Sequence, residues 1–438
     1  MLHTAPTKAF LSKEILSIPY FRDQMVHVSM HGNIYSIFFD EERNSFRIYK
    51  LNLQHLEYDE LPVPTHDQKE QDLKLYIQSA CVVGNDIYIY AEKAFSSAFI
   101  FKISFSSSDD SMPSDTPFCE LIHQTTSEYH RLYLTPLIGD SQRKCLYLIG
   151  GCYFKGGYNR DVLKFDIEQR TWSIISQFYY SPALYLQSAT LWKNRYIVMF
   201  GGFITSCAAC SDVIAFDLDT KEWWTCYKTT HYGDADLLSP YARYNSGIAL
   251  VSNQYASNFI SNTTSQSLFE LNTLFIYGGF IDTILKYNNV TRIIQRVSHE
   301  VLLFPLDESK WVSDDEIQTI QPLSLTDYCN PCPEKLKIHE IPQNNPIFST
   351  HGFEEDNQDD SSEFKILPAT IPQGLFHYYN PCKGEECLFV ITMSNGQVNE
   401  KFKDRNCLIK LVLTKEQGTL FKGIGAHNNL TDTVFMHE

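Results

Sequence analysis

The chain has 438 residues, of which 43% are hydrophobic, and its formal net charge at pH 7 is −16. This size allows a large core, and the negative charge argues against nucleic acid or an anionic membrane as the main partner. No apolar run approaches the roughly 18 residues that a membrane-spanning helix needs, so we expect no membrane insertion. Twelve cysteines without a secretory signal pattern favour free thiols in the cytoplasm or nucleus.

Short β-rich segments separated by turn residues follow one another along the chain, and the aromatic content of 14% also favours an all-β protein. Six of these segments are candidate repeat units. Their apolar strands start at residues 34, 87, 146, 197, 274 and 388. The first three intervals, of 53, 59 and 51 residues, suit a repeat of about 50 residues, and the last two are longer.

Three of the six units share a motif. An apolar strand ends in two glycines, an aromatic residue follows on a later strand, and a tryptophan stands seven residues after that aromatic. The residues are Gly150, Gly151, Phe165 and Trp172; Gly201, Gly202, Phe216 and Trp223; and Gly278, Gly279, Phe304 and Trp311. From the second glycine to the tryptophan there are 21 residues in two copies and 32 in the third, which indicates a loop insertion.

This register resembles the kelch repeat of eukaryotic intracellular proteins, in which a double glycine closes one strand and a tryptophan lies on the outer strand. Phe165-Asp166 and Phe216-Asp217 fit the aromatic-Asp pair of that repeat, whereas the third copy has Pro305 in place of the aspartate. The resemblance implies a kelch-type β-propeller with six four-stranded blades, and seven blades remain an alternative. The first, second and sixth units lack the glycine pair.

We expect residues 1–438 to form a single propeller domain. Residues 313–370 are rich in acidic and polar residues and carry no strand that ends in a glycine pair, which predicts a flexible insertion between the last two blades. The ring must also be closed. Residues 8–18 could add the outer strand of the last blade, or residues 419–424 or 433–436 could do so, and the sequence leaves these alternatives open.

A second pattern precedes three of the apolar strands. It consists of a large polar residue, any residue, an amide and a serine, in Tyr76–Ser79, Tyr185–Ser188 and Arg243–Ser246. By resemblance to ligand-bound kelch propellers, these elements and the loops after the glycine pairs should share one face around the channel mouth. The candidate partner-binding residues are Tyr76, Gln78, Tyr153, Tyr158, Tyr185, Gln187, Arg243, Tyr244 and Asn245. The alternative is that the amides and serines hydrogen-bond the backbone at blade junctions.

Other chemistry is weakly represented. Cys207 with Cys210 and Cys329 with Cys332 form two CxxC pairs, but 119 residues separate the pairs, so we expect no metal site and no cofactor. The sequence has no HExxH motif and no serine in a nucleophile elbow. Galactose oxidase shows that a kelch propeller can carry out catalysis, but it is a larger, secreted protein.

The sequence therefore predicts a protein-binding scaffold or adaptor and not an enzyme. Tyrosine and arginine dominate protein-interaction hot spots, and Arg243, together with Arg131 or Arg160, suggests an acidic or phosphorylated peptide as partner. Signalling, cell polarity and ubiquitin-dependent degradation all remain open as roles. The alternative is an enzyme or a carbohydrate-binding protein that uses the channel mouth.

Overall fold

The structure is a computed structural model of the chain, and its described residues contain β-strands and no α-helix. The described residues are 10–17, 25–62, 74–93, 96–105, 117–127, 130–153, 157–177, 184–204, 208–227, 243–252, 272–287, 290–297, 301–306, 308, 311, 323–324, 371–380, 385–393 and 407–414.

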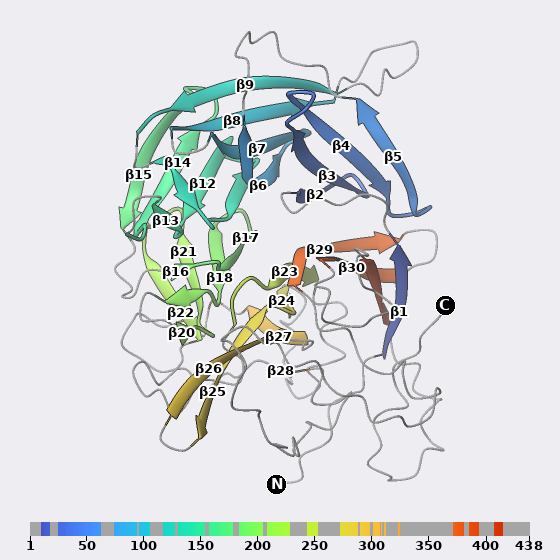
Figure 1. Cartoon of the computed structure of the whole chain (residues 1–438), viewed down its shortest axis with the longest axis vertical. Coiled ribbons are helices and arrows are strands. Elements are labelled where there is room, and N and C mark those ends of the chain that lie inside the picture. Colours follow the sequence, from blue (N-terminus) through green and yellow to red (C-terminus); the bar gives the residue numbers. More distant parts are fainter. Residues whose placement is uncertain are drawn as a thin grey trace.

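The described strands include six four-stranded antiparallel sheets, which we call blades 1 to 6 (Figure 1). Blade 1 is β2 (Val26–Met30), β3 (Asn33–Asp40), β4 (Ser45–Asn52) and β5 (Glu57–Pro62). Blade 2 is β6 (Leu75–Val83), β7 (Asp86–Lys93), β8 (Ser97–Ser104) and β9 (Phe118–Thr125). Blade 3 is β11 (Leu137–Asp140), β12 (Cys145–Ile149), β14 (Asp161–Asp166) and β15 (Thr171–Gln177).

The remaining three blades follow the same order from inner to outer strand. Blade 4 is β17 (Ser188–Trp192), β18 (Tyr196–Phe200), β21 (Val213–Asp217) and β22 (Trp223–Tyr227). Blade 5 is β23 (Gly247–Ser252), β24 (Asn272–Tyr277), β27 (Val301–Leu306) and β28 (Leu323–Ser324). Blade 6 is β29 (Ile371–Asn380), β30 (Glu385–Met393), β31 (Cys407–Thr414) and β1 (Phe10–Ser17).

The blades form a closed ring. Their inner strands contact one another in the order β2, β6, β11, β17, β23 and β29, and β29 contacts β2 again. The N-terminal strand β1 completes blade 6 by pairing with β31 from Phe10↔Thr414 to Ser17↔Cys407. The first of the two predicted ring closures is therefore the one found, and the fold is an all-β propeller of four-stranded antiparallel blades. The number of blades in the whole chain stays a prediction.

The core lies between neighbouring blades. In β7, Ile87 and Ile89 pack against blade 1, whereas Tyr88 and Tyr90 pack in a cluster with blade 3. Similar clusters join blades 3 and 4, blades 4 and 5, and blades 6 and 1. Because both faces of a blade are covered, its middle strands are apolar at successive positions and do not alternate with polar residues. This explains why the strands before the glycine pairs are continuous apolar runs.

The glycine pairs are required by the backbone and by the next blade. All six glycines have positive φ, for example +64° at Gly201 and +103° at Gly202, a region that other residues rarely adopt. A Cβ atom on Gly150 would lie 2.7 Å from the carbonyl oxygen of Leu184 in the segment that enters blade 4. The backbone of one blade thus approaches the next too closely for any side chain at this point.

The aromatic-Asp-Trp register is a hairpin between the third and fourth strands. Phe165 pairs directly with Trp172, and their ring centroids are 5.1 Å apart. The turn between them is held by Asp166, whose Oδ1 accepts a hydrogen bond of 2.9 Å from the backbone nitrogen of Gln169. Phe216 and Trp223 repeat this arrangement in blade 4, so the fixed seven-residue spacing is the length of one hairpin.

The third copy differs from the prediction. Trp311 does not lie on an outer strand, because the outer strand of blade 5 is β28, which comes later in the chain. Trp311 packs instead against Trp192 and Tyr196 of blade 4, with ring centroids 5.1 and 4.9 Å away. Strand β28 also lies within the predicted insertion 313–370, whose other residues are outside the described part of the chain.

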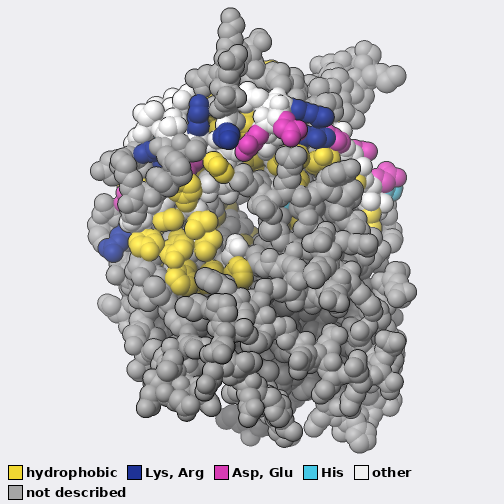
Figure 2. All heavy atoms as spheres, viewed as in Figure 1, with side chains coloured by type: hydrophobic (Ala, Val, Ile, Leu, Met, Phe, Trp, Pro, Cys, Tyr) yellow, Lys and Arg dark blue, Asp and Glu magenta, His cyan; other side chains and the backbone are white. Residues whose placement is uncertain are grey.

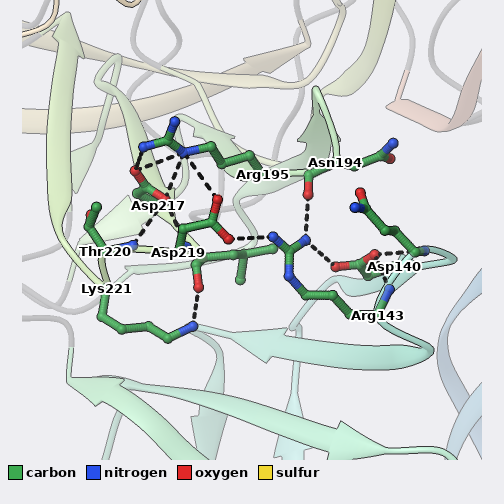
Figure 3. A network of polar contacts seen from close by, with 10 residues as sticks. Asp140, Arg143, Asn194, Arg195, Asp217, Asp219, Thr220 and Lys221 are labelled. Atoms are coloured by element: carbon green, nitrogen blue, oxygen red, sulfur yellow. Dashed lines mark hydrogen bonds and ion pairs between the residues drawn. The ribbon is translucent and has the colours of Figure 1, made fainter.

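On the face opposite the glycine pairs, charged side chains join blades 3 and 4 (Figure 3). Arg143 donates to Asp140 of its own blade at 2.9 Å and to Asp219 of blade 4 at 2.6 Å. Arg195 donates from Nη2 to Asp217 at 2.6 Å. The backbone nitrogens of Asp219 and Thr220, in the turn after Asp217, donate to the same carboxylate. Burial opposes ionisation of Asp217, but the hydrogen bonds from Arg195 and the backbone outweigh it and lower the pKa of this carboxyl.

Candidate functional site

A small hairpin follows each glycine pair and pairs with the residues that enter the same blade. In blade 3, β13 (Cys152–Tyr153) pairs with β10 (Leu132–Tyr133). In blade 4, β19 (Phe203–Ile204) pairs with β16 (Leu184–Tyr185) and with β20 (Ala208–Ala209). In blade 5, Phe280 forms an isolated bridge with Tyr244. We call the three hairpins that follow the glycine pairs the mouth hairpins.

The third mouth hairpin is an enlarged version of the other two. It consists of β25 (Phe280–Tyr287) and β26 (Val290–Val297), which pair with each other over their whole length. The predicted insertion in the third copy is therefore an extended β-hairpin that leaves the strands of blade 5 in their normal order.

Backbone hydrogen bonds join the segments that enter blades 3, 4 and 5. Because each of these segments pairs with its mouth hairpin, the three mouth hairpins form one row. Leu186 N donates to Leu134 O at 3.1 Å, and Asn245 N donates to Leu186 O at 2.8 Å. These three residues occupy equivalent places, because each has a φ between +54° and +57° and each follows a tyrosine that pairs with its mouth hairpin. The sequence pattern was therefore one residue out of register: Arg243–Ser246 corresponds to Leu184–Gln187 and not to Tyr185–Ser188.

Tyr76–Ser79 is not part of this row. It lies within the inner strand β6, where a bulge falls between Ile77 and Ser79. Gln78 still contacts the row, because its Oε1 accepts a hydrogen bond of 3.5 Å from the backbone nitrogen of Leu134. Tyr76 is 37% exposed.

A continuous chain of aromatic rings crosses the mouth hairpins of blades 3, 4 and 5. Tyr158 stacks on Tyr185 at 5.3 Å, and Tyr185 meets the edge of Phe203 at 5.4 Å. Phe203 contacts Tyr244 at 5.0 Å, and Tyr244 stacks on Phe280 at 5.4 Å. We call these five residues the aromatic chain. Its members come from segments far apart in the sequence, so only the propeller brings them together.

Part of this surface is open to solvent. Tyr158 is 38% exposed and Leu134 is 43% exposed, whereas Tyr185 and Phe203 are half-buried. Figure 2 shows hydrophobic side chains gathered on this face in the region of β16 and β18. The hydroxyl group of Tyr153 donates a hydrogen bond of 3.1 Å to Oδ1 of Asn159, which is fully buried, and this bond fixes the tyrosine side chain.

Three of the predicted partner-binding residues are buried and hold the fold together. Arg243 has 0% exposure, and its Nη1 lies 3.5 Å from the carbonyl oxygen of Gly278. Gln187 donates from Nε2 to Ile149 O at 2.6 Å, and Tyr244 is covered by the aromatic rings on either side. The side-chain amide of Gln187 therefore hydrogen-bonds the backbone at a blade junction, which was the alternative to a binding role. The burial of Arg243 also removes this residue as support for an acidic or phosphorylated partner.

The sequence pattern missed Leu134, Leu186, Phe203 and Phe280. The place directly after a glycine pair would have pointed to Phe203 and Phe280, and the place two residues before the inner strand would have pointed to Leu186, whereas Leu134 stands three residues before its strand and fits neither signal. The half-buried Asn245 was predicted as a site residue equivalent to Gln78 and Gln187. In the structure it occupies the place of Leu134 and Leu186.

The described residues offer no metal centre. They contain no group of three or more His, Cys, Asp or Glu side chains that could hold an ion. Cys210 is buried, and its sulfur accepts a hydrogen bond of 3.2 Å from Asp212 N. Its CxxC partner Cys207 and the pair Cys329 and Cys332 lie outside the described residues. Among the described elements, no helix has the length and apolar character needed to cross a bilayer.

Residues 141–178, which run from the first turn of blade 3 through its outer strand, match the family described as "Kelch motif". The chain carries a kelch motif. The match covers the glycine pair, Phe165 and Trp172 of that blade, and the four-stranded blades make the whole a kelch-type propeller. No curated protein matches the chain. A solved structure described as "Structure of YjhT" is similar to 92% of this chain and 97% of that one, with a TM-score of 0.49 and 9% identity.

Proposed function

We propose that this kelch propeller is an intracellular protein-interaction scaffold or adaptor of eukaryotic type, and that its partner binds across the aromatic chain. The observation that carries the proposal is the row of contacting rings from Tyr158 to Phe280, flanked by the exposed Leu134. Tyrosine and phenylalanine are enriched at protein interfaces because they bury much apolar area at a small cost in side-chain entropy. A role in signalling, cell polarity or ubiquitin-dependent degradation would follow from the partner.

The rigidity of the surface also supports binding. The aromatic side chains stand on short β-hairpins, and the backbone bonds from Asn245 to Leu186 and from Leu186 to Leu134 fix the hairpins relative to one another. A partner would therefore meet a preorganised surface and lose less binding energy to ordering it. Buried thiols such as those of Cys81 and Cys226 suit a cytoplasmic or nuclear protein.

Affinity purification followed by mass spectrometry tests the proposal with two matched double variants. Tyr158→Ala/Tyr185→Ala removes the exposed end of the aromatic chain. Phe118→Ala/Ile174→Ala removes two apolar residues that are 55% and 54% exposed on the outer strands of blades 2 and 3. We expect stoichiometric partners to be lost from the first variant and kept by the second, with the melting temperatures of both near that of the wild type.

Equal partner sets in the two variants would contradict the placement of the site. If the wild type has no stoichiometric partner, and a sugar or another small molecule raises its melting temperature in a way that depends on Tyr158 and Tyr185, the face serves an enzyme or a carbohydrate-binding protein instead. Aromatic faces suit sugar rings as well as peptides, so this readout separates the two functions.

A further inference from the structure

Glu92 occupies an unusual place in blade 2. In blades 3, 4 and 5 the second strand ends at a glycine pair, whereas in blade 2 Ala91 and Glu92 stand at these positions and β7 continues through them. The Glu92 side chain is only 1% exposed. It faces residues 130–133, which lead to Leu134 and include β10, the strand that pairs with the mouth hairpin of blade 3. A buried carboxyl group is expensive unless it is neutral or well compensated.

The hydrogen bonds around Tyr90 indicate where a proton resides. Tyr90 Oη lies 2.8 Å from the carbonyl oxygen of His130, 2.8 Å from the backbone nitrogen of Leu132 and 3.1 Å from Glu92 Oε1. A hydroxyl group has one hydrogen and two lone pairs. The backbone nitrogen of Leu132 can only donate, so it uses one lone pair, and His130 O and an ionised Glu92 both need the one hydroxyl hydrogen as acceptors. All three contacts are satisfied together only when the carboxyl group carries a proton and donates it to the second lone pair, which leaves the hydroxyl hydrogen for His130 O.

The other groups that face Glu92 come from two segments, namely residues 130–133 and strand β13. Tyr133 hydrogen-bonds to it and Arg131 acts on it by its charge, both from the entering segment, and Cys152 of β13 is near enough to sense its charge. Burial is the largest effect and raises the pKa of Glu92 to about 7, although Tyr133, Tyr90 and Arg131 act in the opposite direction. Burial and the neighbouring His123 lower the pKa of His130, so this imidazole is neutral at neutral pH.

We propose that Glu92 is a proton-operated latch between blade 2 and residues 130–134 at the channel mouth. In its protonated state, its carboxyl group donates to Tyr90, which in turn holds both His130 O and Leu132 N. When the proton is lost, the carboxylate can no longer donate to Tyr90 and competes with His130 O for the hydroxyl hydrogen. Residues 130–134 then lose the hydrogen bond from Tyr90 to His130 O, and Leu134 loses its fixed position beside the aromatic chain. The latch does not depend on which partner, if any, the face binds.

The sign of the pH dependence follows from the raised pKa. Between the ordinary glutamate pKa of 4.5 and about 7, the folded protein binds more protons than the unfolded chain. Stability from this group is therefore full at or below pH 4.5 and falls as the pH rises toward 7. The variant Glu92→Gln keeps a donor at this place but does not titrate, so its stability should lack this decline.

Hydrogen exchange of the wild-type protein between pH 6 and pH 8, corrected for intrinsic exchange rates, tests the latch. We expect the protection of residues 130–134 to fall by about tenfold over this range in the wild type, since the fraction of protonated carboxyl falls by about that factor. Glu92→Gln should keep its protection across the range. Glu168→Gln, which changes an exposed glutamate on the opposite face, should behave as the wild type does.

Equal pH dependence in the wild type and Glu92→Gln would overturn the latch. Difference infrared spectroscopy gives a second reading that needs only the wild type and therefore holds even if Glu92→Gln fails to fold. We expect the band of a protonated carboxyl group to disappear as the pH passes through about 7. The absence of any carboxyl group that titrates above pH 6 would show that Glu92 is already ionised and would contradict the proposal.

Discussion

Leu184 and Arg243 occupy the same place in two consecutive blades. The backbone carbonyl of each accepts a hydrogen bond from the second glycine of the preceding blade, from Gly151 at 2.9 Å and from Gly202 at 3.0 Å. Both side chains are fully buried. An arginine therefore fills, at the entry to blade 5, a site that a leucine fills at the entry to blade 4, and its role is to support the fold.

Replacement of Arg243 should consequently affect stability. We expect Arg243→Ala to lower the free energy of unfolding by about 3–5 kcal/mol, because it removes a fully buried side chain and leaves the groups that it contacts without their partner. Arg243→Leu should cost less, since leucine suits the equivalent site. Chemical denaturation measures both. A neutral Arg243→Ala would show that the side chain is not buried in solution.

Gly201 of a glycine pair and Gly84 of an ordinary turn offer a matched comparison of backbone conformation and crowding. Gly201 has φ +64° and a Cβ there would overlap the carbonyl oxygen of Arg243, whereas Gly84 has φ +63° with nothing within 4 Å of its Cβ position. Gly84→Ala should cost about 1–2 kcal/mol for the left-handed conformation alone. Gly201→Ala should cost about 3 kcal/mol or more, because the neighbouring blade cannot shift freely. Equal losses of unfolding free energy would argue against close contact between blades at this point.

The two kinds of tryptophan should differ in their contribution to stability. Trp172 is half-buried on an outer strand, whereas Trp311 is buried against Trp192 and Tyr196. We expect Trp311→Ala to cost about 3–5 kcal/mol and Trp172→Ala about 2 kcal/mol. Urea denaturation followed by circular dichroism measures the two losses. A larger loss for Trp172→Ala would show that the outer-strand tryptophan contributes more to stability than the tryptophan packed against blade 4.

The enlarged mouth hairpin should be dispensable for folding. We expect replacement of residues 282–295 by Asn-Gly to leave the melting temperature within a few degrees of the wild type, because β24 and β27 pair without help from the hairpin. In the shortened hairpin the Asn-Gly turn joins the pair Ile281↔Arg296, whereas the natural turn joins the pair Tyr287↔Val290. These two pairs are six residues apart along the strand, which is an even number. The pair beside the turn therefore keeps its place in the alternation of hydrogen-bonded and non-hydrogen-bonded pairs. Differential scanning calorimetry measures the effect. Loss of the cooperative transition would mean that the hairpin is part of the blade.

The fold could be predicted from the sequence because the kelch register is local. Gly150 and Gly151, Phe165 and Trp172 each reflect one turn or one hairpin, and such features show in a single stretch of chain. The site was harder to predict. The place of Arg243 depends on which carbonyl a glycine of the previous blade contacts, and the pairing of Tyr158 with Tyr185 joins two blades. Neither relationship leaves a pattern within one segment. Similar residue types therefore led to the alignment of Arg243–Ser246 with Tyr185–Ser188, which was wrong by one position.

The central claim is that the aromatic chain contacts a protein partner, and site-specific photo-crosslinking tests it most directly. A photoreactive amino acid replaces Tyr158 in one variant and Ile174 in a second, since both positions are exposed and only the first belongs to the aromatic chain. We expect ultraviolet light to join the partner covalently at position 158 and not at position 174. Adducts at position 174 alone, or a stable complex that gives no adduct at position 158, would contradict the claim.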